Sequence, residues 1–373
     1  MAHSHVDPDG LMEFSVVFTD RSLNHMSAVF QQVMRDISGM LKDVYKADHV
    51  AIVPGGGTYG MEAVARQFGA GAHALIVRNG WFSYRWTQIF DAGQFTAKTT
   101  VFKARQAGND TRAPFAPAPI EDVTQAIREA RPDVVFAPHV ETSAGIILPD
   151  DYITQLAAAA HEVGALMVLD CIASGCVWVD MAATGVDVLI SAPQKGWSAS
   201  PSAGLVMMST RAKERLDATT SNSFAIDLKK WSSIMEAYEN GGHAYHATMP
   251  TDALRAFRDT MVETRDYGFD KLRDAQWELG NAVRDMLREK GIKSVAAEGY
   301  GAPGVVVSYT DDPDIQNGKK FAALGMQIAA GVPLQCDEPS DFRTFRLGLF
   351  GLDKLYDVAD TVERLRGVVD QVL

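Results

Sequence analysis

The chain has 373 residues, of which 47% are hydrophobic and 22% charged, and its formal net charge at neutral pH is −12. These fractions are typical of a globular protein, and the length predicts two domains with room for a buried site. The negative charge argues against nucleic acid and an anionic membrane surface as partners, and no uncharged window is long enough to span a bilayer.

Apolar runs that are typical of buried strands alternate with amphipathic helical patterns in the first part of the chain. Helical patterns occupy, for example, residues 61–68 and 151–163. Because strands that alternate with helices form crossover units, this order predicts an α/β fold with a mainly parallel sheet. The strand candidates are residues 49–53, 74–77, 99–102, 134–137, 165–169, 186–190 and 205–208.

The pattern changes after Pro250, where a smaller α+β domain is predicted. Its expected elements are a long helix at 252–290, strands at 301–309 and 345–349, a helix at 318–330 and a last helix that ends at Val372. The domains are placed as an N-terminal segment at 1–20, a large domain at 21–255 and a small C-terminal domain at 256–373. Residues 107–119, rich in Ala and Pro, are expected to form a surface loop.

Lys195 and Asp170 each follow an apolar strand candidate. Ligands of open α/β sheets bind at the carboxyl ends of parallel strands. A buried lysine has a lowered pKa and forms a Schiff base with a carbonyl, and a carboxylate pairs with the pyridinium nitrogen of pyridoxal phosphate. Either residue alone is more often structural, but this one cofactor accounts for both.

A glycine-rich segment, residues 53–62, follows the first strand candidate and opens a helix. Backbone N–H groups at a helix N-terminus bind phosphate, and the helix dipole favours the anion. Gly55, Gly57 and Gly60 also satisfy a dinucleotide fingerprint, which requires an acidic residue about 20 positions later. The next strand ends instead at Arg78, without an acid. We therefore rank pyridoxal phosphate first, a structural turn second and a dinucleotide third.

Three segments resemble the class V aminotransferases, in particular their alanine-glyoxylate and serine-pyruvate branch. They are Val168-Leu169-Asp170, Gln194-Lys195 and Ser202-Ala203-Gly204-Leu205, within a resemblance that extends over residues 24–351. The resemblance implies a fold-type I transferase that depends on pyridoxal phosphate. Such an enzyme has a large domain with a mainly parallel seven-stranded sheet, a smaller C-terminal domain and its site at a homodimer interface.

The resemblance also assigns roles to residues that match the family's motifs. It makes Lys195 the Schiff-base lysine and the general base, and it makes Asp170 the partner of the cofactor's ring nitrogen. The other cofactor-binding residues it implies are Gly56, Gly57, Thr58 and Gln194 at the phosphate, Phe82 and Ile172 on the two faces of the ring, and Thr142 at the phenolic oxygen.

Several of these assignments have alternatives. Trp81 could replace Phe82 as the stacking ring, and either could be an ordinary core aromatic. The resemblance implies that Tyr245 and Thr248 reach the phosphate of the neighbouring subunit, although a plain polar loop is the alternative. Arg346 lies on an apolar strand and is assigned to the substrate α-carboxylate, with an internal salt bridge as the alternative.

Further residues receive weaker assignments. Asn24 and His25 lie where the family's N-terminal segment approaches a neighbouring site. Glu141 and His139 are expected to be structural, bonding loop amides beneath the site. The segment 7–20 replaces a Gly- and Pro-rich signature common in the family, so substrate identity is where the resemblance is weakest.

We therefore expect an aminotransferase that moves an amino group from a small L-amino acid to a small 2-oxo acid, such as glyoxylate or pyruvate, by a ping-pong route. The alternatives are a lyase or cysteine desulfurase using Cys336, and more remotely a dinucleotide-dependent oxidoreductase. Gln194 stands where desulfurases usually carry His, so Cys336 is expected to be an inert buried thiol. No metal is expected. Three cysteines and a start without the features of a secretory signal predict a cytoplasmic enzyme.

Overall fold

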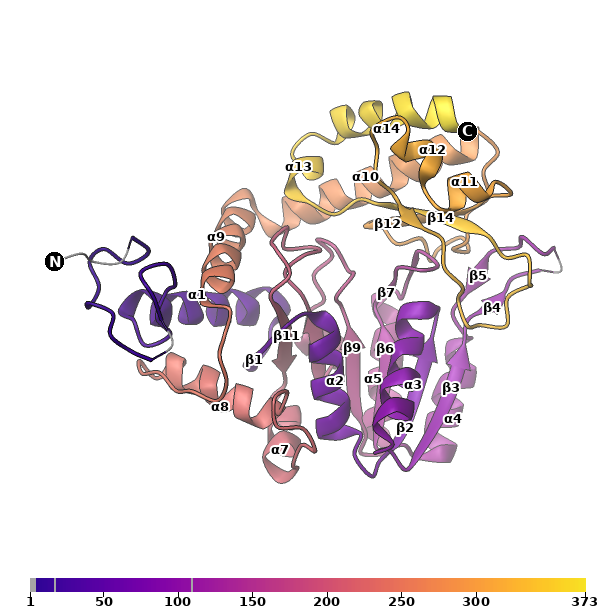
Figure 1. Cartoon of the computed structure of the whole chain (residues 1–373). Helices are drawn as coiled ribbons and strands as arrows, with labels where there is room; N and C mark the ends of the chain where they lie inside the picture. The colour runs from indigo at the N-terminus through magenta and orange to yellow at the C-terminus, as the bar shows by residue number, and fades with distance from the viewer. Residues whose placement is uncertain (1–4, 17, 109) are drawn as a thin grey trace.

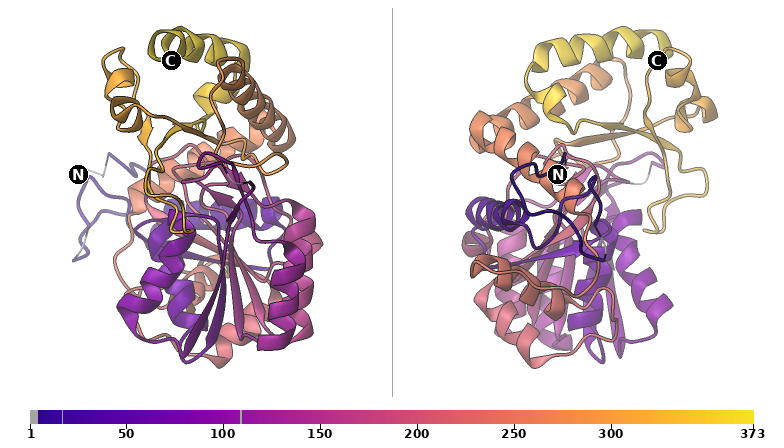
Figure 2. Two further views of the ribbon diagram at one scale, coloured as in Figure 1. Left: turned by 90° about the vertical axis from the view of Figure 1, so that its right-hand side faces the viewer. Right: turned by 60° about the vertical axis from the view of Figure 1, so that its left-hand side comes forward.

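The computed structural model describes residues 5–16, 18–108 and 110–373. A seven-stranded sheet forms its larger part, and helices cover both faces of this sheet (Figures 1 and 2). All seven predicted strands are present, as β1 (His49–Pro54), β2 (His73–Arg78), β3 (Lys98–Lys103), β6 (Val134–Pro138), β9 (Leu166–Asp170), β10 (Val188–Ser191) and β11 (Ala203–Met208).

The strand order in this sheet is β1-β11-β10-β9-β6-β2-β3. β11 runs antiparallel to both of its neighbours, whereas the pairs from β10 to β3 are all parallel. The predicted α/β fold with a mainly parallel sheet is therefore confirmed. β9 and β10 are buried along their whole length, which explains why a parallel strand reads as a continuous apolar run.

Helices flank the sheet at both faces and continue into the C-terminal part. Those of the first 250 residues are α1 (Ala28–Tyr45), α2 (Gly57–Phe68), α3 (Trp81–Gly93), α4 (Ile120–Ala130), α5 (Asp150–Glu162), α6 (Met181–Thr184), α7 (Thr210–Ala218) and α8 (Leu228–Glu239). Two short hairpins, β4 (Arg105–Gln106) with β5 (Phe115–Ala116) and β7 (Val140–Glu141) with β8 (Ile146–Ile147), project from the sheet. Residues 107–119 are thus not a plain loop, because Phe115 pairs in β5 and is buried.

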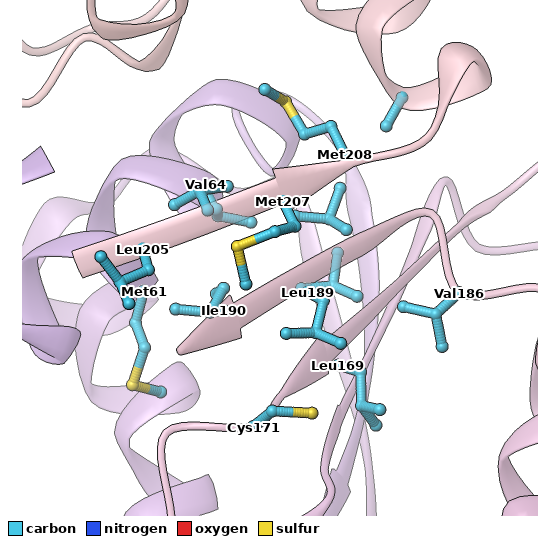
Figure 3. Close-up of a cluster of buried hydrophobic side chains, with 14 of the residues drawn as sticks. Met61, Val64, Leu169, Cys171, Val186, Leu189, Ile190, Leu205, Met207 and Met208 are labelled. Carbon is cyan, nitrogen blue, oxygen red and sulfur yellow. The ribbon is translucent and has the colours of Figure 1, made fainter. Parts of the chain in front are cut away.

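Helix α2 packs closely on β11 because two glycines meet there. A Cβ atom on Gly204 would lie 2.7 Å from the Cα atom of Gly60, so neither position has room for a side chain without a shift. Figure 3 shows the core beside this contact, with Met61 of α2 near Leu205 of β11. This close packing fixes the N-terminus of α2 over the carboxyl end of β1.

The C-terminal part forms a smaller layer above the sheet (Figure 1). Its three-stranded antiparallel sheet has the order β12-β14-β13. The elements are α9 (Thr251–Tyr267), α10 (Phe269–Glu289), β12 (Val305–Tyr309), α11 (Pro313–Gln316), α12 (Lys319–Ala322), β13 (Ala329–Ala330), β14 (Thr344–Gly348), α13 (Leu352–Leu355) and α14 (Val358–Val372). The domain boundaries expected from the sequence stay predictions.

Two expectations for this part were wrong. The helix predicted over residues 252–290 is broken at Gly268, whose φ of 109° separates α9 from α10. The helix predicted at 318–330 is only the short α12, because Gly325 takes a φ of 77° and the chain then extends into β13. No helix in the described part of the chain is both long and apolar enough to cross a membrane.

Candidate active site

The carboxyl ends of β9 and β10 carry the two residues that the sequence singled out. Asp170 is the last residue of β9 and pairs in register with Ile190 of β10. β10 ends at Ser191, and the loop that follows carries Lys195 before β11 begins. Both functional groups therefore start from one edge of the sheet, where open α/β folds bind ligands.

The Lys195 loop is held by close backbone contacts. A Cβ atom on Gly196 would lie 2.0 Å from the carbonyl oxygen of Gly175, so only glycine fits there. The Leu352 amide donates a hydrogen bond of 2.9 Å to the hydroxyl of Ser198, whose φ is 57°. The C-terminal part thus fixes the loop from above.

Lys195 has an unusual environment for a lysine. Its amine is half-buried and lies 4.9 Å from the centroid of the Phe350 ring. Burial lowers the pKa of this amine, and the positive charge of Arg346 lowers it further. Among the described residues, no carboxylate lies within 4 Å of it. A lysine amine with a lowered pKa is a better nucleophile and base at neutral pH.

The carboxyl of Asp170 is buried and, among the described residues, accepts one hydrogen bond, from the Ile172 amide at 2.9 Å. Burial, with a smaller contribution from the nearby carboxylate of Glu141, raises the pKa of Asp170 to about 7, although the hydrogen bond from the Ile172 amide and the positive charge of Arg85 oppose this shift. A cation placed beside such a buried carboxyl would stabilise its charged form and lower its pKa.

The N-terminus of α2 supplies open space and backbone donors. No heavy atom lies within 4 Å of the position that a Cβ atom on Gly56 would take, whereas one on Gly57 would meet the Ile172 side chain at 2.6 Å. The Ile172 side chain therefore reaches from the end of β9 to the first turn of α2. The Thr58 hydroxyl accepts a hydrogen bond of 3.0 Å from the guanidinium of Arg85.

Glu141 organises the start of α3. Its fully buried carboxylate accepts hydrogen bonds from the backbone amides of Phe82 (3.1 Å), Ser83 (2.9 Å) and Ser143 (3.1 Å). The hydroxyls of Ser83 and Ser143 each donate to it at 2.7 Å. Glu141 is therefore the structural residue that was expected. Gly80 permits this approach, because a Cβ atom there would lie 2.1 Å from the Ser143 hydroxyl oxygen.

Phe82 and Trp81 differ in what their rings contact. The Phe82 ring lies 5.6 Å from the guanidinium of Arg346 and 5.2 Å from that of Arg85. The Trp81 ring packs instead against Tyr84, with ring centroids 5.8 Å apart. Of the two aromatic candidates, Phe82 is the one beside Arg346.

Three further predicted residues lie at this edge of the sheet or in the loops beyond it. Thr142 is buried in the turn between β7 and β8. The Oε1 atom of Gln194 is buried and has no hydrogen-bond partner among the described residues. The ring of His139 shares a 2.7 Å hydrogen bond with the Ser174 hydroxyl, and burial lowers its pKa to about 4. His139 bonds this hydroxyl through its ring, where a loop amide was expected.

Arg346 lies on β14 and projects a partly buried guanidinium. Its Nε atom donates a 2.8 Å hydrogen bond to the Ala330 carbonyl oxygen. Within the described ranges it forms no ion pair, so the alternative of an internal salt bridge is not observed there. The terminal nitrogens of the guanidinium thus have no protein carboxylate to bind.

A second group of predicted residues gathers elsewhere. The rings of His25 and Tyr245 lie 5.5 Å apart, and the Tyr245 hydroxyl is 3.3 Å from that of Thr248. The Asn24 amide donates to the carboxylate of Glu13 at 2.5 Å. Tyr245 is 57% exposed. In the part of the chain that the structure describes, no hydrogen bond or ring contact joins this group to Lys195, Asp170 or Arg346.

Sequence reasoning missed two residues of the site. Arg85 contacts Thr58 and the Phe82 ring, and its position one turn after Phe82 on a helix was a usable signal. Phe350 lies under the Lys195 amine, but it reads in the sequence as one more apolar residue.

Cys336 does not have the properties of a nucleophile. Its thiol is 5% exposed, donates to the Arg78 carbonyl oxygen at 3.4 Å, and has its pKa raised to about 12 by burial. The expectation of an inert buried thiol fits this setting. The Arg78 guanidinium itself donates hydrogen bonds to the Thr87 hydroxyl and to the Gln335 carbonyl oxygen, so two of its nitrogens already have partners within the protein.

The chain matches the family model of class-V aminotransferases over residues 13–303. It is 25% identical over 330 residues to alanine–glyoxylate aminotransferase 1 of Saccharomyces cerevisiae, which covers 83% of this chain and 82% of the yeast protein. It is 24% identical over 353 residues to the small subunit of the soluble hydrogenase of a Synechococcus species. That alignment covers 94% of this chain and 88% of the hydrogenase subunit. The crystal structure of an alanine–glyoxylate aminotransferase from Nostoc sp. has a similar fold, with a TM-score of 0.79 and 22% sequence identity. The superposition covers 94% of this chain and 89% of the Nostoc chain. The chain belongs to the class-V aminotransferase family.

Proposed function

We propose that the chain is an aminotransferase that uses pyridoxal phosphate to move an amino group from a small L-amino acid to a small 2-oxo acid. The donor is of the alanine, serine or aspartate type, the acceptor is glyoxylate or pyruvate, and the two react in turn by a ping-pong route. The observation that carries this proposal is the Lys195 amine, which has a lowered pKa and no described carboxylate partner. The relatives named alanine–glyoxylate aminotransferases support the choice of substrates.

The residues around Lys195 fit pyridoxal phosphate. The open space at Gly56 and the N-terminal amides of α2 suit its phosphate, and Thr58 and Gln194 add polar groups there. The buried carboxyl of Asp170, with its raised pKa, suits a protonated ring nitrogen. Phe82 and Ile172 provide apolar surface for the two ring faces, and Thr142 a hydroxyl for the ring oxygen.

Pyridoxal phosphate, when bound, supplies a carbonyl that takes up the amino group and a ring that withdraws electrons from the substrate Cα. The Lys195 amine would hold the cofactor and, when free, would take a proton from the substrate Cα and give it back. Its lowered pKa leaves more of the free amine available at neutral pH. Asp170 would hold a protonated ring nitrogen by charge attraction.

Arg346 would bind the α-carboxylate of both substrates. Its guanidinium has no described carboxylate partner, and a planar fork binds a carboxylate through two parallel hydrogen bonds. Phe82 lies beside the guanidinium and helps to orient it. The substrate carbon that reacts is thereby held between Arg346 and Lys195.

We further propose a homodimer in which Tyr245 and Thr248 reach the cofactor phosphate of the partner, with Asn24 and His25 near the partner's substrate. The exposure of Tyr245 and its separation from Lys195 within one chain support this arrangement. The three described cysteines are free and buried, which supports a reducing, cytoplasmic location.

Absorption spectra of the purified protein with pyridoxal phosphate test this function. A visible band is expected that bleaches when L-alanine, L-serine or L-aspartate is added and returns with glyoxylate or pyruvate. A matched sample with D-alanine controls for non-specific reaction of the cofactor. A protein that stays colourless with added cofactor, or whose band responds to none of these donors, would contradict the proposal.

A further inference from the structure

A cavity of about 870 Å³ lies away from Lys195 and the residues proposed to bind cofactor and substrate. Its walls are α10, the loop at 291–301 and the tip of the β4–β5 hairpin, residues 107–108 and 110–114. In Figure 1 this hairpin stands at the side of the molecule, beneath the C-terminal layer. The volume is within the range of sites that take organic ligands.

Arg284 of α10 lines this cavity and has no carboxylate partner within 4 Å among the described residues. Its guanidinium donates to two neutral acceptors, the carbonyl oxygens of Gly280 and Ala302. It packs against Gly301, where a Cβ atom would lie 2.6 Å from its Nε atom. Burial lowers the pKa of Arg284 to about 10, so the group stays charged at neutral pH. A partly buried cation without a counter-charge is costly, and an anion in the cavity would offset that cost.

The other cations at the cavity are already paired. Lys293 binds Asp110 at 2.6 Å, and the two remaining arginines in the lining are paired in the same way. These pairs are Arg112 with Asp311 and Arg288 with Asp285. Glu298 also lines the cavity, but it is exposed and does not pair with Arg284. The uncompensated positive charge of the cavity is therefore that of Arg284.

The wall near Arg284 is apolar. Trp277 lies two turns before Arg284 on α10 and is partly buried, and the buried side chains of Leu287 and Val306 continue this surface. An indole face offers stacking area to a flat ring. The cavity thus combines one unpaired guanidinium with an aromatic and aliphatic wall.

We propose that this cavity is a second ligand site, which takes an organic anion with its acidic group on Arg284 and a flat apolar body against Trp277. The guanidinium fork binds a carboxylate, phosphate or sulfonate through two parallel hydrogen bonds. Because Lys195 does not line the cavity, a ligand bound there is not placed to react at Lys195.

The test is a fluorescence titration with 8-anilinonaphthalene-1-sulfonate, an aromatic sulfonate that fluoresces when it leaves water. The protein is first loaded with pyridoxal phosphate, so that the Lys195 site is filled, and excess cofactor is then removed, because a free aromatic phosphate would itself compete for the cavity. Saturable binding is expected for the wild type, and Arg284→Met should weaken it at least about tenfold, because it removes a charged hydrogen-bonding partner. The matched control is Arg273→Met on the same helix, since Arg273 pairs with Asp270 at 2.9 Å and lies outside the cavity. The affinity of Arg273→Met for the probe should equal that of the wild type.

Absence of saturable binding, or equal affinity of Arg284→Met and the wild type, would overturn the proposal. Because the loss of Arg284 also changes the packing of α10, a crystal structure of the unmutated protein with the same probe provides a second measurement. A sulfonate at Arg284 would support the site, and a probe bound only elsewhere would overturn it.

Discussion

Asp170, the last residue of β9, pairs in register with Ile190 of β10, five residues before Lys195. A one-residue slip of this register would turn the side chains of one strand to the other face of the sheet. The register therefore determines on which face Asp170 and the start of the Lys195 loop are presented. Both strands are buried on both faces, and their packing makes such a slip costly.

The raised pKa of Asp170 predicts that the stability of the apoprotein depends on pH, and that bound cofactor removes this dependence. Its pKa is about 7 in the folded apoprotein against an ordinary value of 3.8, so the folded state holds the extra proton between these values. The free energy of unfolding of the apoprotein should therefore fall as pH rises from about 4 to about 7, and the total loss is set by the difference between the two pKa values. If the cofactor binds as proposed, its cationic ring would lower this pKa and flatten the dependence.

Melting temperatures of the apoprotein and of the loaded protein at about pH 5 and about pH 8 check this expectation. Asp170→Asn provides the control, because an amide does not titrate. Its apoprotein should lose less stability between the two pH values than the wild type does. An equal loss in both would show that Asp170 is not the group responsible.

Arg346→Gln should raise the KM for the amino-acid donor by roughly 10- to 100-fold, because a hydrogen bond to a charged group is worth about 1.5–3 kcal/mol. The visible spectrum of the bound cofactor should change little. Arg343→Gln, which removes a surface bond to the Asp311 carbonyl, is the control and should keep the KM of the wild type. Steady-state kinetics measures both KM values, and an unchanged KM in Arg346→Gln would contradict the assignment of Arg346 to the substrate carboxylate.

Glu141→Ala should lower both stability and cofactor affinity. The substitution leaves the buried amides of Phe82, Ser83 and Ser143 without their acceptor, at about 1–3 kcal/mol for each unsatisfied group. The ring of Phe82, which we propose to stack on the cofactor, then loses its support. Thermal unfolding and cofactor titration measure the two effects, and a melting temperature equal to that of the wild type would contradict this account of Glu141.

Gly196→Ala should displace the Lys195 loop, because the new Cβ atom would lie 2.0 Å from the Gly175 carbonyl oxygen. We expect weaker cofactor binding and lower stability. Gly39→Ala is the matched control on α1, where nothing lies within 4 Å of the new atom, and it should stabilise the helix by up to about 1 kcal/mol. If thermal unfolding gave the two variants the same change, the close contact at Gly196 would be refuted.

The sheet could be predicted from the sequence because its parallel strands are buried on both faces and read as apolar runs. The errors occurred in the C-terminal part, where Gly268 and Gly325 end helices that the apolar pattern alone would extend. Lys195 and Asp170 could be found because each directly follows a strand. Arg85 and Phe350 could not be assigned in this way, because their positions depend on how distant segments pack.

The group around Tyr245 shows a second limit of prediction. The resemblance assigns Tyr245 and Thr248 to the cofactor phosphate, yet their hydroxyls bond each other, and among the described residues no hydrogen bond or ring contact joins either to Lys195. Their assignment depends on a second subunit, which no pattern in a single sequence describes. A sedimentation experiment that found only monomers in an active preparation would contradict the proposed interface.

The central claim is that Lys195 holds the cofactor, and borohydride reduction followed by peptide mass spectrometry tests it most directly. The wild type, loaded with pyridoxal phosphate, is reduced and digested, with Lys98→Ala at the opposite edge of the sheet as the matched control. We predict that the peptide containing Lys195 carries the reduced cofactor in both proteins, and that Lys195→Ala carries none there and has no visible band. Label on other lysines only, or a visible band and turnover retained in Lys195→Ala, would contradict the account.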